Sequence, residues 1–129
     1  MFADFILQQE IESVMNRIVT DARIAYAIEP PEKRGRLRFY QHEMPSIDKV
    51  QDIEVGKPWY KLKGETIYYN GESSPITSGN YLSGVIVKKF EYYQKPDHPK
   101  LLYITIEAES FQTKHRIRLT TEVYMRGLQ

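Results

Sequence analysis

The chain has 129 residues, and its 18 basic and 17 acidic side chains leave a formal net charge of +1, which excludes a general electrostatic attraction to nucleic acid or to anionic membranes. It contains no cysteine, which excludes disulfides, thiolate metal sites and a cysteine nucleophile. A chain of this length is expected to fold as one domain, covering residues 1–129.

The first predicted element is an amphipathic helix over about residues 4–28. At about 100° per residue, apolar side chains gather on one narrow stripe of this helix. The residues of the stripe are Leu7, Ile11, Val14, Ile18, Ala22 and Ala25. We expect the stripe to pack on the rest of the domain. Pro30 and Pro31 are expected to end the helix, because proline lacks an amide proton and restricts the residue before it.

The start of this helix is crowded with apolar residues. Phe2, Phe5 and Ile6 lie in or near its first turn, and Ile6 is well off the apolar stripe. Apolar residues all around a helix end indicate either burial of that end or continuation of a more apolar segment. A frayed N-terminus that folds back onto the domain is the alternative interpretation.

After the prolines, apolar and polar side chains alternate, as they do on a strand. In RGRLRFYQ, Leu37 and Phe39 are expected on one face of the strand. Arg36, Arg38 and Tyr40 are then expected on the other face. The segment therefore predicts a strand with one apolar and one basic side.

The middle of the chain predicts further strands. Ile53 and Val55 alternate with acidic residues, which is compatible with a short strand. The segment WYKLKGETIYYNGESSP predicts a hairpin that turns near Lys63-Gly64-Glu65, with a second break at Asn70-Gly71.

The last third of the chain predicts a three-stranded antiparallel meander. Val85 and Val87 lead into the first strand, and QKPDHP turns the chain into the second. The apolar faces of the second and third strands consist of Leu102, Ile104, Ile106 and Ala108, and of Ile117, Leu119, Thr121, Val123 and Met125. The predicted fold class is therefore α+β, with a long N-terminal helix packed on an antiparallel β-sheet and a β-rich region over about residues 36–126.

No group of residues in the sequence predicts catalysis, a cofactor or a metal ion. His42, His98 and His115 lack the spacing of metal ligands, and no phosphate-binding glycine loop is present. His42 lies beside an acidic residue that would suit a general base, but a solvated loop is the favoured interpretation. Asp52 and Glu54 would share a strand face, which is more often a solvated surface than a catalytic pair. We therefore predict that the chain is not an enzyme.

Two clusters combine cations with aromatic rings. Arg36, Arg38 and Tyr40 would form a cationic strand face with a stacking ring, which is how single-stranded nucleic acid is often held. The alternative is an edge strand protected by charge. Trp59 and Tyr60 lie between lysines in KPWYKLKG and are candidate surface aromatics for a carbohydrate or a protein partner.

The order of segments resembles that of minor pilins and pseudopilins, the larger-headed minor subunits of type IV pili, type II secretion systems and competence machines. LQQEIESVMNRIVTDARIAYAI resembles the soluble half of the pilin helix, and WYKLKGETIYYNGESSPI is similar to the hairpin of the family. YLSGVIVKKFEYY, PKLLYITIEAES and KHRIRLTTEVYMRG resemble the strands that follow. The Thr-Thr-x-Val-Tyr-x-Arg pattern near the end is the most specific piece.

This resemblance implies a pilin-like fold and a structural role in filament assembly, with no bond-making chemistry in the domain. The partners that it implies are other pilins or pseudopilins of the same filament, with DNA as an additional partner in a competence system. It also implies a location at the cell membrane, with the head outside the cytoplasm.

Members of this family carry a leader, a cleavage site and a long apolar half-helix, and these parts are not in the sequence. The resemblance implies that the half-helix, which would insert in the membrane, was removed, with Met1 as an added start codon. Phe2, Phe5 and Ile6 would then mark the boundary of the apolar part. The candidate assembly contacts are Phe2, Phe5, Ile6 and Ile24.

Two other functions are compatible with the sequence. The chain would be an extracellular module that binds a glycan or a protein through Trp59 and Tyr60, or a single-stranded nucleic-acid-binding domain that uses Arg36, Arg38 and Tyr40. Salt-sensitive oligonucleotide binding that is lost in an Arg36→Ala/Arg38→Ala variant would support the second function. Tight binding of a sugar would favour the first.

Overall fold

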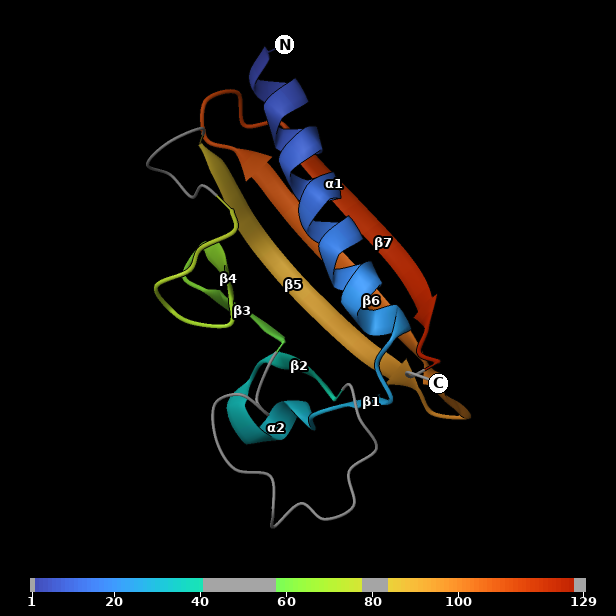
Figure 1. The fold of residues 1–129 in the computed structure, drawn as a ribbon. Coiled ribbons are helices and arrows are strands. Elements are labelled where there is room, and N and C mark those ends of the chain that lie inside the picture. Colours follow the sequence, from blue (N-terminus) through green and yellow to red (C-terminus); the bar gives the residue numbers. More distant parts are fainter. Residues whose placement is uncertain (1, 41–57, 78–83, 127–129) are drawn as a thin grey trace.

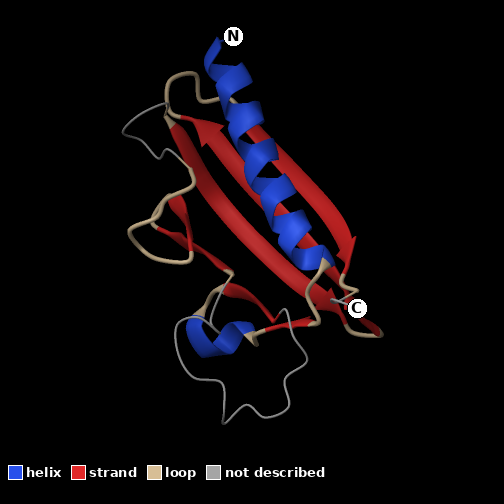
Figure 2. Cartoon of the chain, in the orientation of Figure 1, coloured by secondary structure: helices blue, strands red, loops and turns tan. Residues whose placement is uncertain are grey.

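The computed structural model describes residues 2–40, 58–77 and 84–126, and Figures 1 and 2 show its elements. The helices are α1 (Phe2–Arg23), which has 22 residues, and α2 (Pro31–Arg34), which has 4. The strands are β1 (Ala27–Ile28), β2 (Leu37–Tyr40), β3 (Trp59–Lys63), β4 (Thr66–Tyr69), β5 (Val85–Lys95), β6 (His98–Ser110) and β7 (Arg116–Tyr124). α1 lies along one face of the long strands, and the short strands lie beside them (Figure 1).

The described strands form two antiparallel sheets. β1, β2, β3 and β4 make a sheet of short strands, and β5, β6 and β7 make a sheet of long strands. The predicted α+β class, with a long helix packed on one antiparallel sheet in the pilin-like manner, is therefore wrong, because the fold is mostly β, with one N-terminal helix and two sheets. Alternation indicates which residues form strands, but it does not indicate which strands exchange hydrogen bonds. The described strands form two sheets because β4 and β5 do not exchange ladder hydrogen bonds with each other.

The predicted end of the first helix is also wrong. α1 ends at Arg23, and the N–H of Tyr26 already donates to the carbonyl oxygen of Tyr40 at 2.7 Å. β1 then pairs antiparallel with β2. The chain leaves the helix because it gains these sheet hydrogen bonds, and the prolines are not the cause. Pro31 instead opens α2, at the first-turn position that proline favours.

The apolar stripe of α1 is confirmed as the face that packs on the long-stranded sheet, where α1 contacts β6 and β7 (Figure 2). The buried residues of the stripe are Leu7, Ile11, Val14, Ile18, Ala22 and Ala25, the last of which lies just beyond the helix. β6 buries the predicted set, namely Leu102, Ile104, Ile106 and Ala108. The core therefore lies between α1 and one face of β5–β7, and it extends to the buried side chains of the short strands.

The predicted hairpin and meander are both confirmed. β3 and β4 pair with Leu62 opposite Ile67, and Gly64 in their turn has a φ of +65°, which glycine adopts without the steric cost of a Cβ atom. β5, β6 and β7 pair in chain order, with a turn between Lys95 and His98. Some residues named above lie outside the described ranges: His42, Asp52, Ile53, Glu54 and Val55.

Candidate functional site

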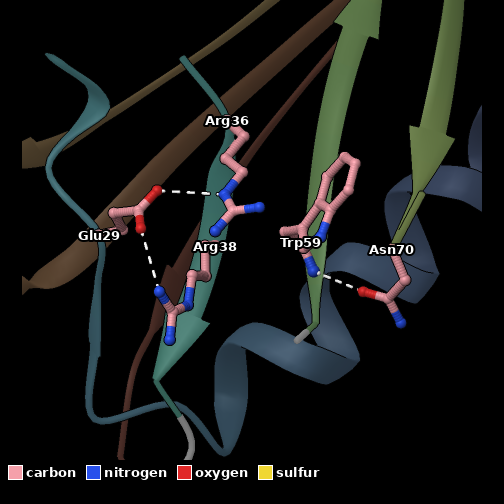
Figure 3. A network of polar contacts seen from close by, with 5 residues as sticks. All are labelled: Glu29, Arg36, Arg38, Trp59 and Asn70. Carbon is pink, nitrogen blue, oxygen red and sulfur yellow. Dashed lines mark hydrogen bonds and ion pairs between the residues drawn. The ribbon is translucent and has the colours of Figure 1, made fainter. Parts of the chain in front are cut away.

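The predicted basic strand face surrounds a carboxylate. Glu29 follows β1, Arg36 directly precedes β2 and Arg38 lies within β2 (Figure 3). Arg36 Nε is 3.2 Å from Oε2 of Glu29, and Arg38 Nη1 is 3.1 Å from Oε1. The backbone N–H of Glu29 also donates to the carbonyl oxygen of Arg38 at 2.9 Å. We call these three residues the Glu29 cluster.

The Glu29 cluster is buried rather than exposed. Glu29 is 1% exposed and Arg38 is 4% exposed, so the prediction that Arg38 projects from a solvated face is wrong. Strand alternation separates the two sides of β2, but the rest of the fold covers both of them. A carboxylate between two guanidinium groups neutralises much of the charge that phosphates would need. This arrangement disfavours a nucleic-acid groove at Arg36 and Arg38.

Cations cover the aromatic rings beside the Glu29 cluster. The guanidinium carbon of Arg36 is 5.2 Å from the centre of the Trp59 ring, and that of Arg38 is 4.8 Å from the Tyr40 ring. The backbone N–H of Trp59 donates to Oδ1 of Asn70 at 2.8 Å (Figure 3). The structure thus brings Trp59 of the second predicted cluster to Arg36, Arg38 and Tyr40 of the first, which the sequence did not predict, and the four residues form a packed unit in the short-stranded sheet.

Tyr60 belongs to a different group of contacts, because it points to the opposite side of β3 from Trp59. It is fully buried, so its assignment as a surface aromatic is wrong. Its hydroxyl donates to Oδ2 of Asp21 at 2.6 Å, which joins β3 to α1. Burial raises the pKa of Asp21 above its ordinary value, although the Tyr60 hydrogen bond and the charge of Arg17 oppose the rise. No local pattern signals this pair, since its members are 39 positions apart.

Replacing Tyr60 with phenylalanine is expected to lower the free energy of unfolding by about 1–3 kcal/mol, because a half-buried carboxylate then loses its hydroxyl donor while the packing of the ring is kept. Urea denaturation checks this value. Tyr93→Phe, on an exposed ring, is the matched control and should change stability by less than about 0.5 kcal/mol. Equal effects of the two substitutions would contradict the role of the Asp21–Tyr60 bond.

The raised pKa of Asp21 predicts a pH dependence of stability. A carboxyl whose pKa is higher in the folded state stabilises the fold below its unfolded pKa, and this contribution is lost as the pH rises through the folded pKa. The Asp21→Asn variant carries an amide that does not titrate but still accepts the Tyr60 hydrogen bond. The unfolding free energy of the natural chain minus that of the variant should therefore fall from about pH 3 to about pH 7. Urea titrations across this range measure it, and a rising difference would refute the assignment.

The candidate assembly contacts at α1 differ in exposure. Phe5 is 61% exposed, whereas Ile6 is half-buried against the core and Ile24 is half-buried in the turn after the helix. Phe2 begins α1, but its side chain is outside the described part of the structure. A groove of about 360 Å³ on this side of α1 is lined by Phe5, Gln8, Gln9 and Glu12.

The outer face of the long-stranded sheet carries aromatic residues that the sequence patterns did not single out. The rings of Tyr93 and Tyr103 stack with their centres 5.0 Å apart and their planes 5° from parallel. Tyr124 on β7 is 54% exposed. A groove of about 420 Å³ at the end of β7 is lined by Arg23, Glu122, Val123, Tyr124 and Arg126. The sequence signal for these rings is their position on the polar side of each alternating strand.

No family model, curated protein or solved structure matches the chain.

The two histidines in the described part of the chain lie far from each other. His98 begins β6 and His115 precedes β7, so both are exposed at opposite ends of the long-stranded sheet. Within residues 2–40, 58–77 and 84–126, no group of three or more His, Cys, Asp or Glu side chains is placed to hold a metal ion. In the same ranges, no helix combines the length and the apolar character needed to cross a membrane.

Proposed function

We propose that the chain is a structural subunit that acts by protein–protein assembly, namely a minor pilin or pseudopilin of a type IV pilus, type II secretion or competence filament. One observation carries the proposal. α1 buries a single stripe on the long-stranded sheet and leaves its opposite face, with Phe5 at its start, open to a partner. The order of segments supports the finer assignment to the pilin class.

The open face of α1 has the chemistry of an interface. Its exposed residues include Phe5, Gln8, Gln9, Glu12, Ser13, Asn16 and Thr20. Gln8 Nε2 donates to Oε2 of Glu12 at 3.1 Å on this exposed face. An aromatic ring inside a polar rim is the usual composition of a protein interface. Covering the exposed 61% of Phe5 would contribute less to association than the roughly 1.5–3 kcal/mol of a full burial.

The second sheet is compatible with this role. Figure 1 shows the short strands and α2 beside the long strands, away from the open face of α1. The Asp21–Tyr60 hydrogen bond connects the short strands to the last turns of the helix, and Thr113 Oγ1 donates to Oδ1 of Asp4 in its first turn at 2.7 Å. A partner helix would meet the exposed face that carries Phe5, Gln9 and Glu12.

The proposal includes an apolar half-helix ahead of Phe2 that anchors the subunit in the cell membrane, with this domain outside the cytoplasm. The coding sequence upstream of Phe2 tests it. We expect a short basic leader, a glycine before the cleavage site and about 20 apolar residues with a glutamate near their start. A polar domain directly upstream would overturn the filament assignment.

Photo-crosslinking tests the assembly surface itself. A benzoylphenylalanine residue replaces Phe5 in the native host, and the control carries it at Glu91, which is exposed on β5. We expect position 5 to form adducts with other subunits of the filament and position 91 to form far fewer. Absence of adducts from position 5, or the same unrelated proteins from both positions, would contradict the proposal.

The Glu29 cluster gives little support to the two alternative functions. A nucleic-acid groove needs cations that are available to phosphates, and a glycan platform needs an uncovered ring, whereas Arg36 lies over Trp59 and also contacts Glu29. DNA stays within the proposal only as a partner of a competence filament. No contact to DNA is assigned to this cluster.

A further inference from the structure

Among the described residues, β7 is the outermost strand of the long-stranded sheet, and its edge away from β6 pairs with no other described strand. It has 9 residues and pairs with β6 without a register shift over its whole length. No described element lies beyond it in the strand order β5-β6-β7, and Figure 1 shows α1 over the face of the sheet rather than along this edge. A regular strand with an open edge is a template for pairing with another strand.

Two hydrogen bonds at the ends of β7 show which backbone groups face this edge. The N–H of Met125 donates to the carbonyl oxygen of Lys100, and the N–H of Ser110 donates to that of His115, both at 2.8 Å. Because the direction alternates along an antiparallel strand, odd-numbered residues of β7 bond to β6. The residues whose N–H and C=O groups point to the open edge are Arg116, Arg118, Thr120, Glu122 and Tyr124.

β7 lacks two of the devices that usually prevent strand pairing, because it contains no proline and has no bulge against β6. Its outward charges are of both signs: the side chains of Arg116 and Arg118 are each 66% exposed, and Glu122 is exposed further along the strand. Beyond Tyr124, the N–H of Arg126 donates to the carbonyl oxygen of Arg23 at 3.1 Å, so the open part of the edge is Arg116–Tyr124 itself.

We propose that β7 pairs antiparallel with β7 of a second copy of the chain, about a two-fold axis at Thr120. The sheet then extends to six strands, three from each copy. In this register Arg118 lies opposite Glu122 of the second copy, and Arg116 lies opposite Tyr124 of the second copy. Every edge-facing N–H of Arg116–Tyr124 finds a carbonyl oxygen, and each cation meets an anion or an aromatic ring.

The same register is favourable on the inner face of the sheet. Ile117 and Leu119 are only half-buried at the rim of the core. They lie opposite Val123 and Thr121 of the second copy, so that pairing covers apolar area that the single chain leaves partly exposed. Charge complementarity outside and apolar contact inside therefore both select a second copy as the occupant.

This inference goes beyond the proposed function, because it uses β7 whereas the assembly proposal uses α1. A two-fold interface is closed and does not propagate, so it would form dimers and not filaments. Failure of the crosslinks at Phe5 would leave the β7 dimer untouched, and a monomeric chain would leave the α1 interface untouched.

Sedimentation equilibrium of the full chain, from micromolar to millimolar concentration, tests the dimer. We expect the mass to rise from one chain to two. Thr120→Pro removes an N–H that faces the edge and leaves the β6 hydrogen bonds in place, so it should abolish the dimer. Thr120→Ala keeps that N–H and should still dimerise. A chain that stays monomeric at every concentration, or a Thr120→Pro variant that still dimerises, overturns the proposal.

A charge swap tests the register in case Thr120→Pro disturbs folding. Arg118→Glu places like charges opposite each other twice per dimer and should weaken dimerisation about tenfold. Glu122→Arg should do the same, and the Arg118→Glu/Glu122→Arg variant should restore it. Amide exchange adds a second readout, because only the N–H groups of the even-numbered residues of β7 should gain protection on dimerisation. Absence of rescue, or uniform protection, would refute this pairing.

Discussion

Replacing Ile18 with lysine is expected to unfold the protein. Ile18 is fully buried in the middle of the α1 stripe. The substitution forfeits about 1.5–3 kcal/mol of apolar burial and places an ammonium group where desolvation costs several kcal/mol more. Domains are usually stable by only about 5–15 kcal/mol, so most of the folding free energy would be lost. Far-UV circular dichroism and a urea titration measure the loss.

The control for this variant lies two positions further along the same helix. Thr20 is exposed, and its Oγ1 donates to the carbonyl oxygen of Asn16 at 2.9 Å. Thr20→Lys removes only this exposed bond and should change stability by less than about 0.5 kcal/mol. The loss of unfolding free energy in Ile18→Ala should lie between those of the two lysine variants, at about 2–5 kcal/mol. If the lysine variants at positions 18 and 20 melted alike, the packing of the stripe on β6 and β7 would be wrong.

Glu29→Ala is expected to destabilise the protein by about 3–5 kcal/mol, because it removes the carboxylate between two guanidinium groups in a buried site. The attraction within the Glu29 cluster compensates the cost of taking Arg38 out of water. Without the carboxylate, the desolvation cost of buried Arg38 is no longer compensated. Chemical denaturation of the variant against the natural chain measures the difference.

Two variants separate charge from shape in this prediction. Glu29→Gln keeps the size of the side chain and one acceptor oxygen but removes the charge. It should therefore lower the free energy of unfolding less than Glu29→Ala does. Glu109→Ala breaks the pair with Arg116, whose side chain is 66% exposed, and should change the free energy of unfolding far less, because solvent screens this pair. A Glu29→Ala variant no less stable than Glu109→Ala would show that the buried pair contributes little to the fold.

Ile18→Lys and Glu29→Ala probe different sheets. Ile18 belongs to the contact of α1 with the long strands, whereas the Glu29 cluster holds β1 and β2 of the short-stranded sheet. The Asp21–Tyr60 bond joins the two regions. If they unfold as one cooperative unit, the milder Ile18→Ala variant and Glu29→Ala should each lower the midpoint of a single transition.

Local periodicity determined much of the fold from the sequence alone. The spacing of Leu7, Ile11 and Ile18 predicted which face of the helix is buried, since helical side chains three and four positions apart lie on one side. Alternation and turn residues predicted the β3–β4 hairpin and the β5–β7 meander, with the buried face of β6 correct. These features depend on neighbours in the chain, so a single sequence carries them.

Only the tertiary structure decided where these elements meet. The exit from α1 at Arg23 depends on hydrogen bonds with β2, and the division into two sheets depends on which edges pair. The charge of buried Arg38 is compensated by Glu29 on a neighbouring strand segment, and the hydroxyl of buried Tyr60 is satisfied by Asp21, which is 39 positions away in the chain. A polar residue on an alternating strand is normally read as exposed, and its burial becomes favourable only when a fold supplies the opposite charge or the acceptor. Local sequence patterns do not contain this pairing energy, which is why the candidate site had to be corrected whereas the β3–β4 hairpin and the β5–β7 meander did not.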